Sequence, residues 1–185
     1  MSEPTIPNLT IPNRTIAKRT MSNRDELFDD WMRLALREAS VAGQRGEIPI
    51  GALVADADGT VLAVSGNRRE GDHDPTAHAE VLALRKAAQA RGDWRLAGCT
   101  LVVTVEPCPM CAGAAVLSRI ETLVIGAWND DYGAAGSRWD LVRDRRLHHM
   151  IEVVSGVRAD ECARLLQGFL ADRRDDDAAS YSGDR

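Results

Sequence analysis

Three side chains in two short segments of the chain have the types and spacing of a metal site that activates water. His78 lies in the first segment, and Cys108 and Cys111 lie in the second as P-C-P-M-C over residues 107–111. One imidazole and two thiolates leave the fourth position of a tetrahedral zinc ion open for water, as catalytic zinc sites require. Two residues between the cysteines let both sulfur atoms reach one ion. The spacing therefore predicts a Zn²⁺ site.

Glu80 is expected to act as a base and an acid rather than as a ligand. It follows His78 by two positions, which is about 200° around a helix, so the two side chains cannot point the same way. Its carboxylate is expected to take a proton from water, pass it to the substrate and then protonate departing ammonia. H-x-E together with P-C-x-x-C is the signature of zinc-dependent deaminases of nucleic-acid bases. The predicted reaction is therefore hydrolytic removal of an amino group.

Two other uses of the cysteine pair stay open. A C-x-x-C pair at a helix start is also typical of thioredoxin-like redox sites, although His78 and Glu80 would then have no function. A purely structural zinc site needs a fourth protein ligand, and Cys99, Cys162 or His73 could supply it. Cys162 falls on the apolar stripe of a predicted helix and Cys99 at a strand edge, so core positions account for both.

The elements that position these side chains alternate between helix and strand. Each half of the motif follows a turn and opens a helix, where unpaired N–H groups favour the thiolate form of cysteine. Apolar periodicity predicts helices around 28–42, 77–88, 109–118 and 162–169, and strands at 50–55, 60–64, 100–105, 122–127 and 151–154. This alternation predicts a three-layer α/β/α domain with a mixed five-stranded central sheet.

Length and composition indicate one globular domain with two tails. The 185 residues suffice for a single core. We expect a disordered extension over 1–23, a folded unit over 24–172 and a disordered acidic tail over 173–185. Because the chain has no run of about 18 apolar residues and no apolar leader, we expect neither a membrane span nor a secretory signal. Four cysteines, two of them in a ligand motif, favour a reducing, cytoplasmic setting.

The net charge of −5 argues weakly against a nucleic-acid partner. Local positive charge can still contact phosphates, and one segment is rich in it. Two interpretations stay open for this segment: a phosphate-contacting surface, or a solvated helical face balanced by nearby carboxylates. The cationic side chains are Arg143, Arg145, Arg146, His148 and His149, with Asp140, Asp144 and Glu152 as the nearby acids.

The motif and its surroundings resemble the bacterial tRNA adenosine deaminases. The matching segments read D-P-T-A-H-A-E at 74–80, E-P-C-P-M-C-A-G-A at 106–114 and G-A-A-G-S at 133–137, with shorter matches at 118–120 and 159–163. The resemblance covers about residues 25–172. It implies a cytidine-deaminase-like fold, a homodimer and conversion of the wobble adenosine of a tRNA anticodon to inosine. By motif position, His78, Cys108 and Cys111 would hold zinc and Glu80 would shuttle the proton.

The resemblance also implies substrate contacts at two asparagines. Asn67 would hydrogen-bond the flipped base, although an asparagine after a strand is also common as a turn residue. Asn129 stands where the family usually has aspartate, and Asp131 where it often has lysine. If this loop lines the nucleotide channel, we expect Asn129 to alter discrimination of the sugar or the flanking nucleotide. A free nucleobase or nucleoside of the guanine or cytosine type remains the alternative substrate, and a non-catalytic zinc-stabilised binding module the alternative class.

Overall fold

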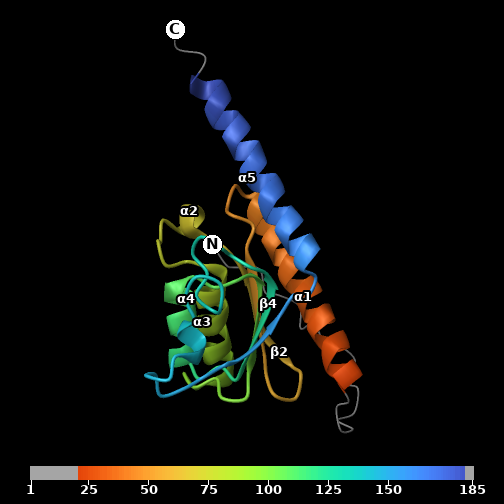
Figure 1. Ribbon diagram of the computed structural model, residues 1–185, viewed down its shortest axis with the longest axis vertical. Coiled ribbons are helices and arrows are strands. Elements are labelled where there is room, and N and C mark those ends of the chain that lie inside the picture. The colour runs from red at the N-terminus through yellow and green to blue at the C-terminus, as the bar shows by residue number, and fades with distance from the viewer. Residues whose placement is uncertain (1–20, 182–185) are drawn as a thin grey trace.

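The computed structural model describes residues 21–181 and shows one mixed sheet of five strands (Figure 1). The strand order is β2-β1-β3-β4-β5. β1 pairs antiparallel with β2 and β3, whereas β3, β4 and β5 run parallel. The strands are β1 (Gly51–Ala55), β2 (Val61–Gly66), β3 (Thr100–Val105), β4 (Thr122–Ala127) and β5 (Glu152–Ser155). The predicted mixed five-stranded sheet is confirmed.

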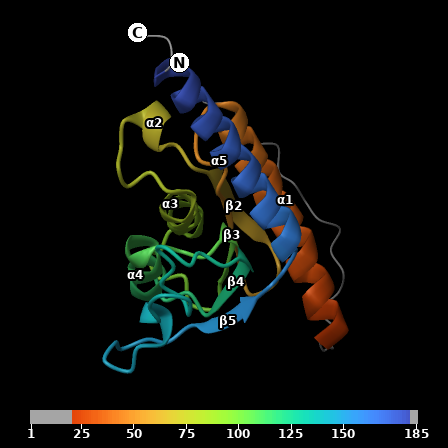
Figure 2. The same cartoon turned by 45° about the horizontal axis from the view of Figure 1, so that its top comes forward.

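Helices cover both faces of this sheet and complete the predicted three layers. The helices α1 (Met21–Gln44) and α5 (Ala159–Tyr181) lie along one face, and α3 (Ala79–Arg91) and α4 (Pro109–Leu117) along the other (Figures 1 and 2). A short helix, α2 (Arg69–Asp72), precedes α3, and a 3₁₀ turn, η1 (Leu141–Arg143), follows β4. None of the described helices is long and apolar enough to cross a bilayer.

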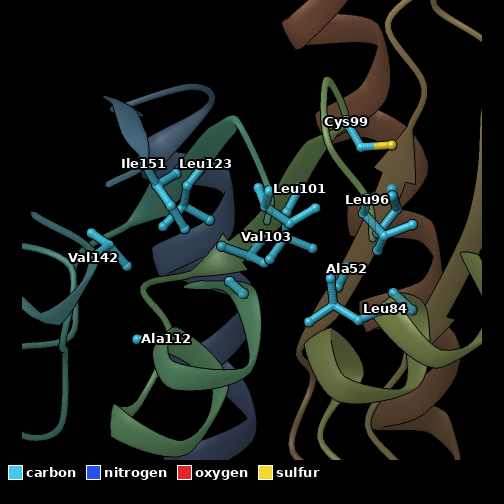
Figure 3. Close-up of a cluster of buried hydrophobic side chains, with 14 of the residues drawn as sticks. Ala52, Leu84, Leu96, Cys99, Leu101, Val103, Ala112, Leu123, Val142 and Ile151 are labelled. Carbon is cyan, nitrogen blue, oxygen red and sulfur yellow. The ribbon is translucent and has the colours of Figure 1, made fainter. Parts of the chain in front are cut away.

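Alternating side chains of the central strands fill two separate cores. Leu101 and Val103 of β3 point toward α3 and α4, where Figure 3 shows them beside Leu84 and Ala112. Val102, between them, points to the opposite core under α1 and α5. This period of two is why the apolar run 100–105 forms a strand buried on both faces.

The parallel strands β3 and β4 bring two functional segments to one edge of the sheet. Val105 pairs with Ala127 at their carboxyl ends, so the residues that follow both strands leave the sheet side by side. One strand leads into the cysteine motif and the other into the loop that contains Asn129. Loops at the carboxyl ends of parallel strands commonly form binding sites, and both predicted segments lie there.

Two helices extend past the predicted limits of the folded unit. α1 begins at Met21, so residues 21–23 are helical rather than part of an extension. α5 continues to Tyr181, nine positions past 172, where a disordered tail was expected. Residues 1–20 and 182–185 lie outside the described part of the chain, and their assignment as tails stays a prediction.

The arginine-rich segment is not the helical face that one interpretation required. It forms the turn η1 and an irregular stretch up to Met150. Its carboxylates nevertheless balance part of its charge: Asp140 accepts from Arg143 Nε at 2.9 Å, and Asp144 pairs with Arg146. Glu152, the third predicted acid, pairs instead with Arg24 at 2.6 Å.

Candidate active site

The three predicted ligands come together at the starts of two helices. His78 is the N-cap residue of α3, Cys108 is the N-cap residue of α4, and Cys111 lies in the first turn of α4. His78 Nδ1 lies 3.7 Å from the Sγ atom of Cys108 and 3.5 Å from that of Cys111. Tetrahedral coordination with ordinary bond lengths separates sulfur and nitrogen ligands by about 3.6 Å. The donor set and its spacing fit Zn²⁺.

No fourth protein ligand completes this cluster among residues 21–181, because only these three ligand atoms lie within 4.8 Å of one another. The candidate fourth ligands of a structural zinc site lie elsewhere. Cys162 is buried in the core under α5, and the Sγ atom of Cys99 lies 2.9 Å from Arg91 Nη1 just before β3. His73 ends the short helix α2. The cluster is therefore open at its fourth position, as a catalytic site requires.

Hydrogen bonds among the ligands set their protonation. The hydrogen bond from Cys111, followed by that from His78, lowers the pKa of Cys108 to about 4. The pKa of His78 is raised, chiefly by its hydrogen bond with Cys108. The pKa of Cys111 is raised by its bond with Cys108, by burial and by the nearby Glu80 carboxylate. Cys108 is therefore the most acidic thiol of the group, and binding of a metal requires the ligand atoms of all three residues to be deprotonated.

Glu80 is a buried carboxylate without a complete set of partners. Only 3% of the residue is exposed, and its Oε2 atom has no hydrogen-bond partner. Burial raises the pKa of its carboxyl group. An unpartnered buried oxygen is costly, and such groups concentrate where a substrate or water completes the bonding. Cys108, His78 and Cys111 also act on the pKa of this carboxyl group, so the carboxylate lies beside the metal cluster.

Asn67 lies next to the segment that leads into His78. The backbone N–H of the following residue, Arg68, donates to the carbonyl of Ala77 at 3.0 Å. Asn67 is buried, and its Nδ2 atom donates to Glu47 Oε2 at 3.1 Å. The contact fixes which way the amide faces. The structure thus places Asn67 beside the segment that leads into His78, while its role in binding a base stays a prediction.

Glu47 organises this side of the site although sequence reasoning did not single it out. Its buried carboxylate accepts the Asn67 amide and also the backbone N–H groups of Glu70, at 3.2 Å, and Gly71, at 2.8 Å. These donors stand 20 to 24 positions away along the chain. An acidic residue just before an apolar strand is the only local signal, and it does not reveal the partners.

Glu106 holds the loop after β4, residues 129–137, through backbone N–H groups, much as Glu47 holds the segment near Asn67. Its buried Oε1 atom accepts the N–H groups of Ala135 at 2.8 Å and Ser137 at 3.0 Å, and its Oε2 atom accepts that of Asn129 at 3.1 Å. A Cβ at Gly133 would lie 2.1 Å from Oε2, so only glycine fits there. The sequence marked Glu106 as part of a motif but not as the anchor of residues 129–137.

The side chain of Asn129 takes part in the structure of this loop. Its Oδ1 atom accepts the backbone N–H of Tyr132 at 3.1 Å, and its carbonyl accepts from Gly133 and from the Ser137 hydroxyl. An aspartate could accept the same N–H, so the family's usual residue is compatible with the loop. A substrate contact by Asn129 therefore falls to its amide nitrogen and stays a prediction.

A family model supports this reading of the cluster. The model describes the cytidine and deoxycytidylate deaminase zinc-binding region, and it matches residues 25–127. The chain belongs to the cytidine and deoxycytidylate deaminase family. Membership contradicts the thioredoxin-like interpretation of the cysteine pair, and it assigns Zn²⁺ to the site formed by His78, Cys108 and Cys111.

Within the deaminase family, similar proteins include enzymes of two substrate classes. The tRNA-specific adenosine deaminase of Bacillus subtilis (strain 168) is 45% identical over 151 residues, which is 82% of this chain and 91% of that protein. A solved structure of a tRNA:A34 deaminase acting in A-to-I editing at the wobble position has a TM-score of 0.72 at 44% identity, covering 74% of this chain and 99% of the other. A guanine deaminase from Nitrosomonas europaea has a TM-score of 0.68 at 26% identity, covering 77% and 84%.

Proposed function

We propose that the protein hydrolyses the amino group of adenosine at the wobble position of a tRNA anticodon, producing inosine and ammonia. The observation that carries the chemistry is the unpartnered, buried Oε2 atom of Glu80 beside a three-ligand zinc cluster. The substrate is supported by relatives named tRNA-specific adenosine deaminase at 45% and 44% identity, over more than four fifths of the chain.

Glu80 moves the protons in this reaction. Zn²⁺ held by His78, Cys108 and Cys111 supplies Lewis acidity at this position when bound. The Oε2 atom of Glu80 accepts a proton from the attacking water and delivers it to a ring nitrogen of the base. Because burial raises the pKa of Glu80, the carboxyl group can hold the proton between the two steps. It then takes the second proton from the hydroxyl group on the amino-bearing carbon and gives it to the departing amino group, which leaves as ammonia as the carbonyl forms.

Asn67 orients the base and Asn129 contacts the nucleotide. The bond from Asn67 Nδ2 to Glu47 holds the amide in one orientation, which favours one hydrogen-bond pattern on the base. Asn129 presents its amide nitrogen from the loop held by Glu106. Replacing it with aspartate exchanges a donor for a charged acceptor, so we expect Asn129→Asp to change the ratio of turnover on matched RNA and single-stranded DNA hairpins. Equal ratios for both proteins would contradict this role.

The enzyme works as a homodimer in the cytoplasm. One face of α4 supports the dimer, because Met110, Gly113, Ala114 and Leu117 recur there at helical spacing. Leu117 is 62% exposed, and a Cβ at Gly113 would meet nothing within 4 Å. A second copy of this chain is the expected cover. Light scattering of the purified protein should give twice the chain mass, and Leu117→Arg should reduce it. The cytoplasmic setting is supported by four free cysteines.

The deciding experiment offers the purified protein anticodon stem-loops that carry each base in turn at the wobble position. Mass spectrometry should find inosine from adenosine and no change in the other three. Glu80→Gln should lower turnover by about 10²–10⁴-fold while the zinc content, measured by elemental analysis, stays at the wild-type level. A non-catalytic zinc module would instead show no turnover by either protein.

Deamination of a free base is the second candidate, favoured by the structural likeness to a guanine deaminase and by the acidic net charge. Free guanine, cytosine and adenosine therefore belong in the same assay. Turnover of a free base without turnover of any stem-loop would replace the proposed substrate while leaving the chemistry intact.

A further inference from the structure

Exposed aromatic side chains gather on the loop that Glu106 anchors. The chain has four tryptophans, and two of them, Trp128 and Trp139, lie in residues 128–139, here called the rim loop. Each is 46% exposed, and Tyr132 between them is 68% exposed. Single exposed apolar side chains are ordinary, whereas several that share one surface often mark an interaction site. The function derived above does not use any of the three.

Trp128 stands beside the metal-binding segment. Trp128 directly follows Ala127, whose partner in the parallel ladder is Val105. Trp128 therefore leaves the sheet beside Glu106, which follows Val105 on the neighbouring strand and precedes Cys108 by two positions. The rim loop also bonds to that segment directly, since the backbone N–H of Ala134 donates to the carbonyl of Pro107 at 2.8 Å. Trp128 therefore lies at the border of the site rather than on a remote surface.

One edge of the Trp128 indole is fixed by packing. A Cβ at Gly136 would lie 3.4 Å from the indole carbons Cζ3 and Cη2, and 3.1 Å from Arg143 Nη2. The indole and the Arg143 guanidinium group therefore both approach the same side of Gly136. A second arginine, Arg138, has its guanidinium carbon 5.6 Å from the Trp139 ring centroid. Rigid aromatic rings beside arginines are the combination that binds unpaired bases and their phosphates.

We propose that Trp128 stacks on an unpaired base next to the target adenosine. This inference rests on the proposed RNA substrate. A base that enters a deaminase pocket leaves its stack, and the neighbouring nucleotide loses a stacking partner at the same time. The indole of Trp128, at the border of the pocket, replaces that partner. Arg143, whose Nε atom donates to Asp140 at 2.9 Å, has its Nη2 atom on the same side of Gly136 as the indole. Trp128 is therefore a specificity residue that acts on the flanking nucleotide.

The test compares two substitutions of Trp128 in a protein that cannot turn over its substrate. Trp128→Phe keeps a ring that can stack, whereas Trp128→Leu keeps apolar packing on Gly136 and removes the ring. Both are made in Glu80→Gln protein loaded with zinc, and affinity is measured by fluorescence anisotropy with a labelled anticodon stem-loop. Trp94→Leu is the matched control, because Trp94 is also exposed, at 54%, and also lies by an arginine, with Arg95 4.3 Å from its ring.

We expect Trp128→Leu to weaken binding by about fivefold to a hundredfold, which is the range for losing one base–aromatic stack. The affinity of the Trp128→Phe protein should stay within about threefold of that of the parent, and the affinity of the Trp94→Leu protein should equal that of the parent. Two further stem-loops carry an abasic site directly 5′ or directly 3′ of the target adenosine. One of them should bind the parent and Trp128→Leu proteins equally, and that RNA identifies the stacked neighbour.

Three results would overturn the inference: equal affinities for the Leu and Phe proteins, a penalty that persists on both abasic RNAs, or a changed oligomeric state of Trp128→Leu, which would assign the indole to an interface between copies. Turnover of the intact stem-loop by unsubstituted protein is scored separately. Editing without a Trp128 effect contradicts only this inference. Failure of the parent protein to bind any stem-loop contradicts the proposed function as well.

Discussion

At the scale of single residues, burial divides the cysteines into two chemical kinds. Desolvation raises the pKa of Cys99 to about 11 and that of Cys162 to about 12, so both are thiols at neutral pH. Cys108 is a thiolate, because hydrogen bonds from Cys111 and His78 lower its pKa to about 4. Thiolates react with disulfide reagents and thiols hardly do. Reactivity in metal-free protein therefore distinguishes Cys108 from the core cysteines Cys99 and Cys162.

We predict that native, zinc-loaded protein reacts slowly with an aromatic disulfide reagent at pH 7. After zinc is removed by a chelator, Cys108 should react quickly with the reagent. Cys111 should react next, because modification of Cys108 removes the hydrogen bond that raises the pKa of Cys111. Cys99 and Cys162 should react only in denaturant. Absorbance of the released thiolate counts the groups, and Cys108→Ser should abolish the fast phase. A fast phase in zinc-loaded protein would show that the cysteines do not hold the metal.

The metal ligands could be predicted from the sequence because the residues of each half of the site lie within a few positions of one another. Cys108 and Cys111 stand three positions apart, and the H-x-E pair supplies His78 and Glu80, so each half of the site reads as a short pattern. Glu47 could not be assigned a function this way. Two of its three partners are backbone N–H groups, which every non-proline residue has, and only the folded chain brings them to the carboxylate.

At the scale of elements, buried segments were predictable and charged ones were not. β3 and β4 match their predicted limits. A short apolar run bounded by turn residues is stable as a strand buried on both faces of a sheet, so its ends can be read from the sequence. The end of α5 was missed, since an Asp-rich stretch gives no apolar stripe that would indicate a helix. The segment after η1 was ambiguous for a related reason. Asp140 and Arg143, three positions apart, pair in a turn as readily as on a helix.

Glu106→Gln should loosen the rim loop without removing any zinc ligand. The amide can replace only one carboxylate oxygen, so its NH₂ group would face either the N–H of Asn129 or those of Ala135 and Ser137. We expect a loss of about 1–3 kcal/mol in the free energy of unfolding. KM for the stem-loop should rise more than kcat falls, because the loop carries substrate contacts and not the reacting groups. Steady-state kinetics and urea unfolding check both effects.

The control for Glu106→Gln is Glu121→Gln, which removes an exposed carboxylate before β4 and should change neither quantity. Unchanged KM in Glu106→Gln, despite lower stability, would mean that the rim loop does not touch the substrate. That result would also contradict the assignment of Asn129 to the nucleotide.

Gly51→Ala should test how closely α1 packs on the sheet. A Cβ at Gly51 would lie 1.9 Å from the carbonyl oxygen of Ala35 in α1, so the backbone of the helix would have to move. We expect a loss of about 1–3 kcal/mol or more. Gly168→Ala is the matched control, because it is an exposed position of α5 with nothing within 4 Å. It should stabilise by about 0.5–1 kcal/mol. Urea denaturation measures both, and equal stabilities would refute the close packing.

At the scale of the whole molecule, the layers followed from the order of the elements, but the assembly did not. Strands alternating with helices restrict the chain to a sheet covered on both faces, and the structure has this arrangement. The sequence does not show which exposed apolar residues share a surface. The face of α4 became visible only with the burial of each residue known. The net charge of −5 did not reveal a nucleic-acid surface either, because it sums the charges of the whole chain and hides any local positive region.

The proposed RNA substrate permits a prediction about how binding affinity depends on salt concentration. An RNA substrate contacted through phosphates should bind with an affinity that falls about tenfold or more between 50 and 200 mM salt, because counterions are released on binding. Anisotropy with a labelled stem-loop measures this slope. Deamination of a free base releases no such counterions, so its KM should be nearly independent of salt and serves as the control. A flat slope for the stem-loop would argue against phosphate contacts.

The anchoring of the rim loop has a consequence for how new specificities arise in this scaffold. Glu106 holds the loop through main-chain N–H groups alone, so the anchor does not depend on the side chains that the loop carries. Positions such as Trp128, Asp131 and Trp139 are free to vary under selection while the loop keeps its course beside the zinc ligands. Evolution, or a laboratory library, can therefore explore substrate preference at these positions at little risk to folding, provided that Glu106, Asn129, Gly133 and Ser137 are kept.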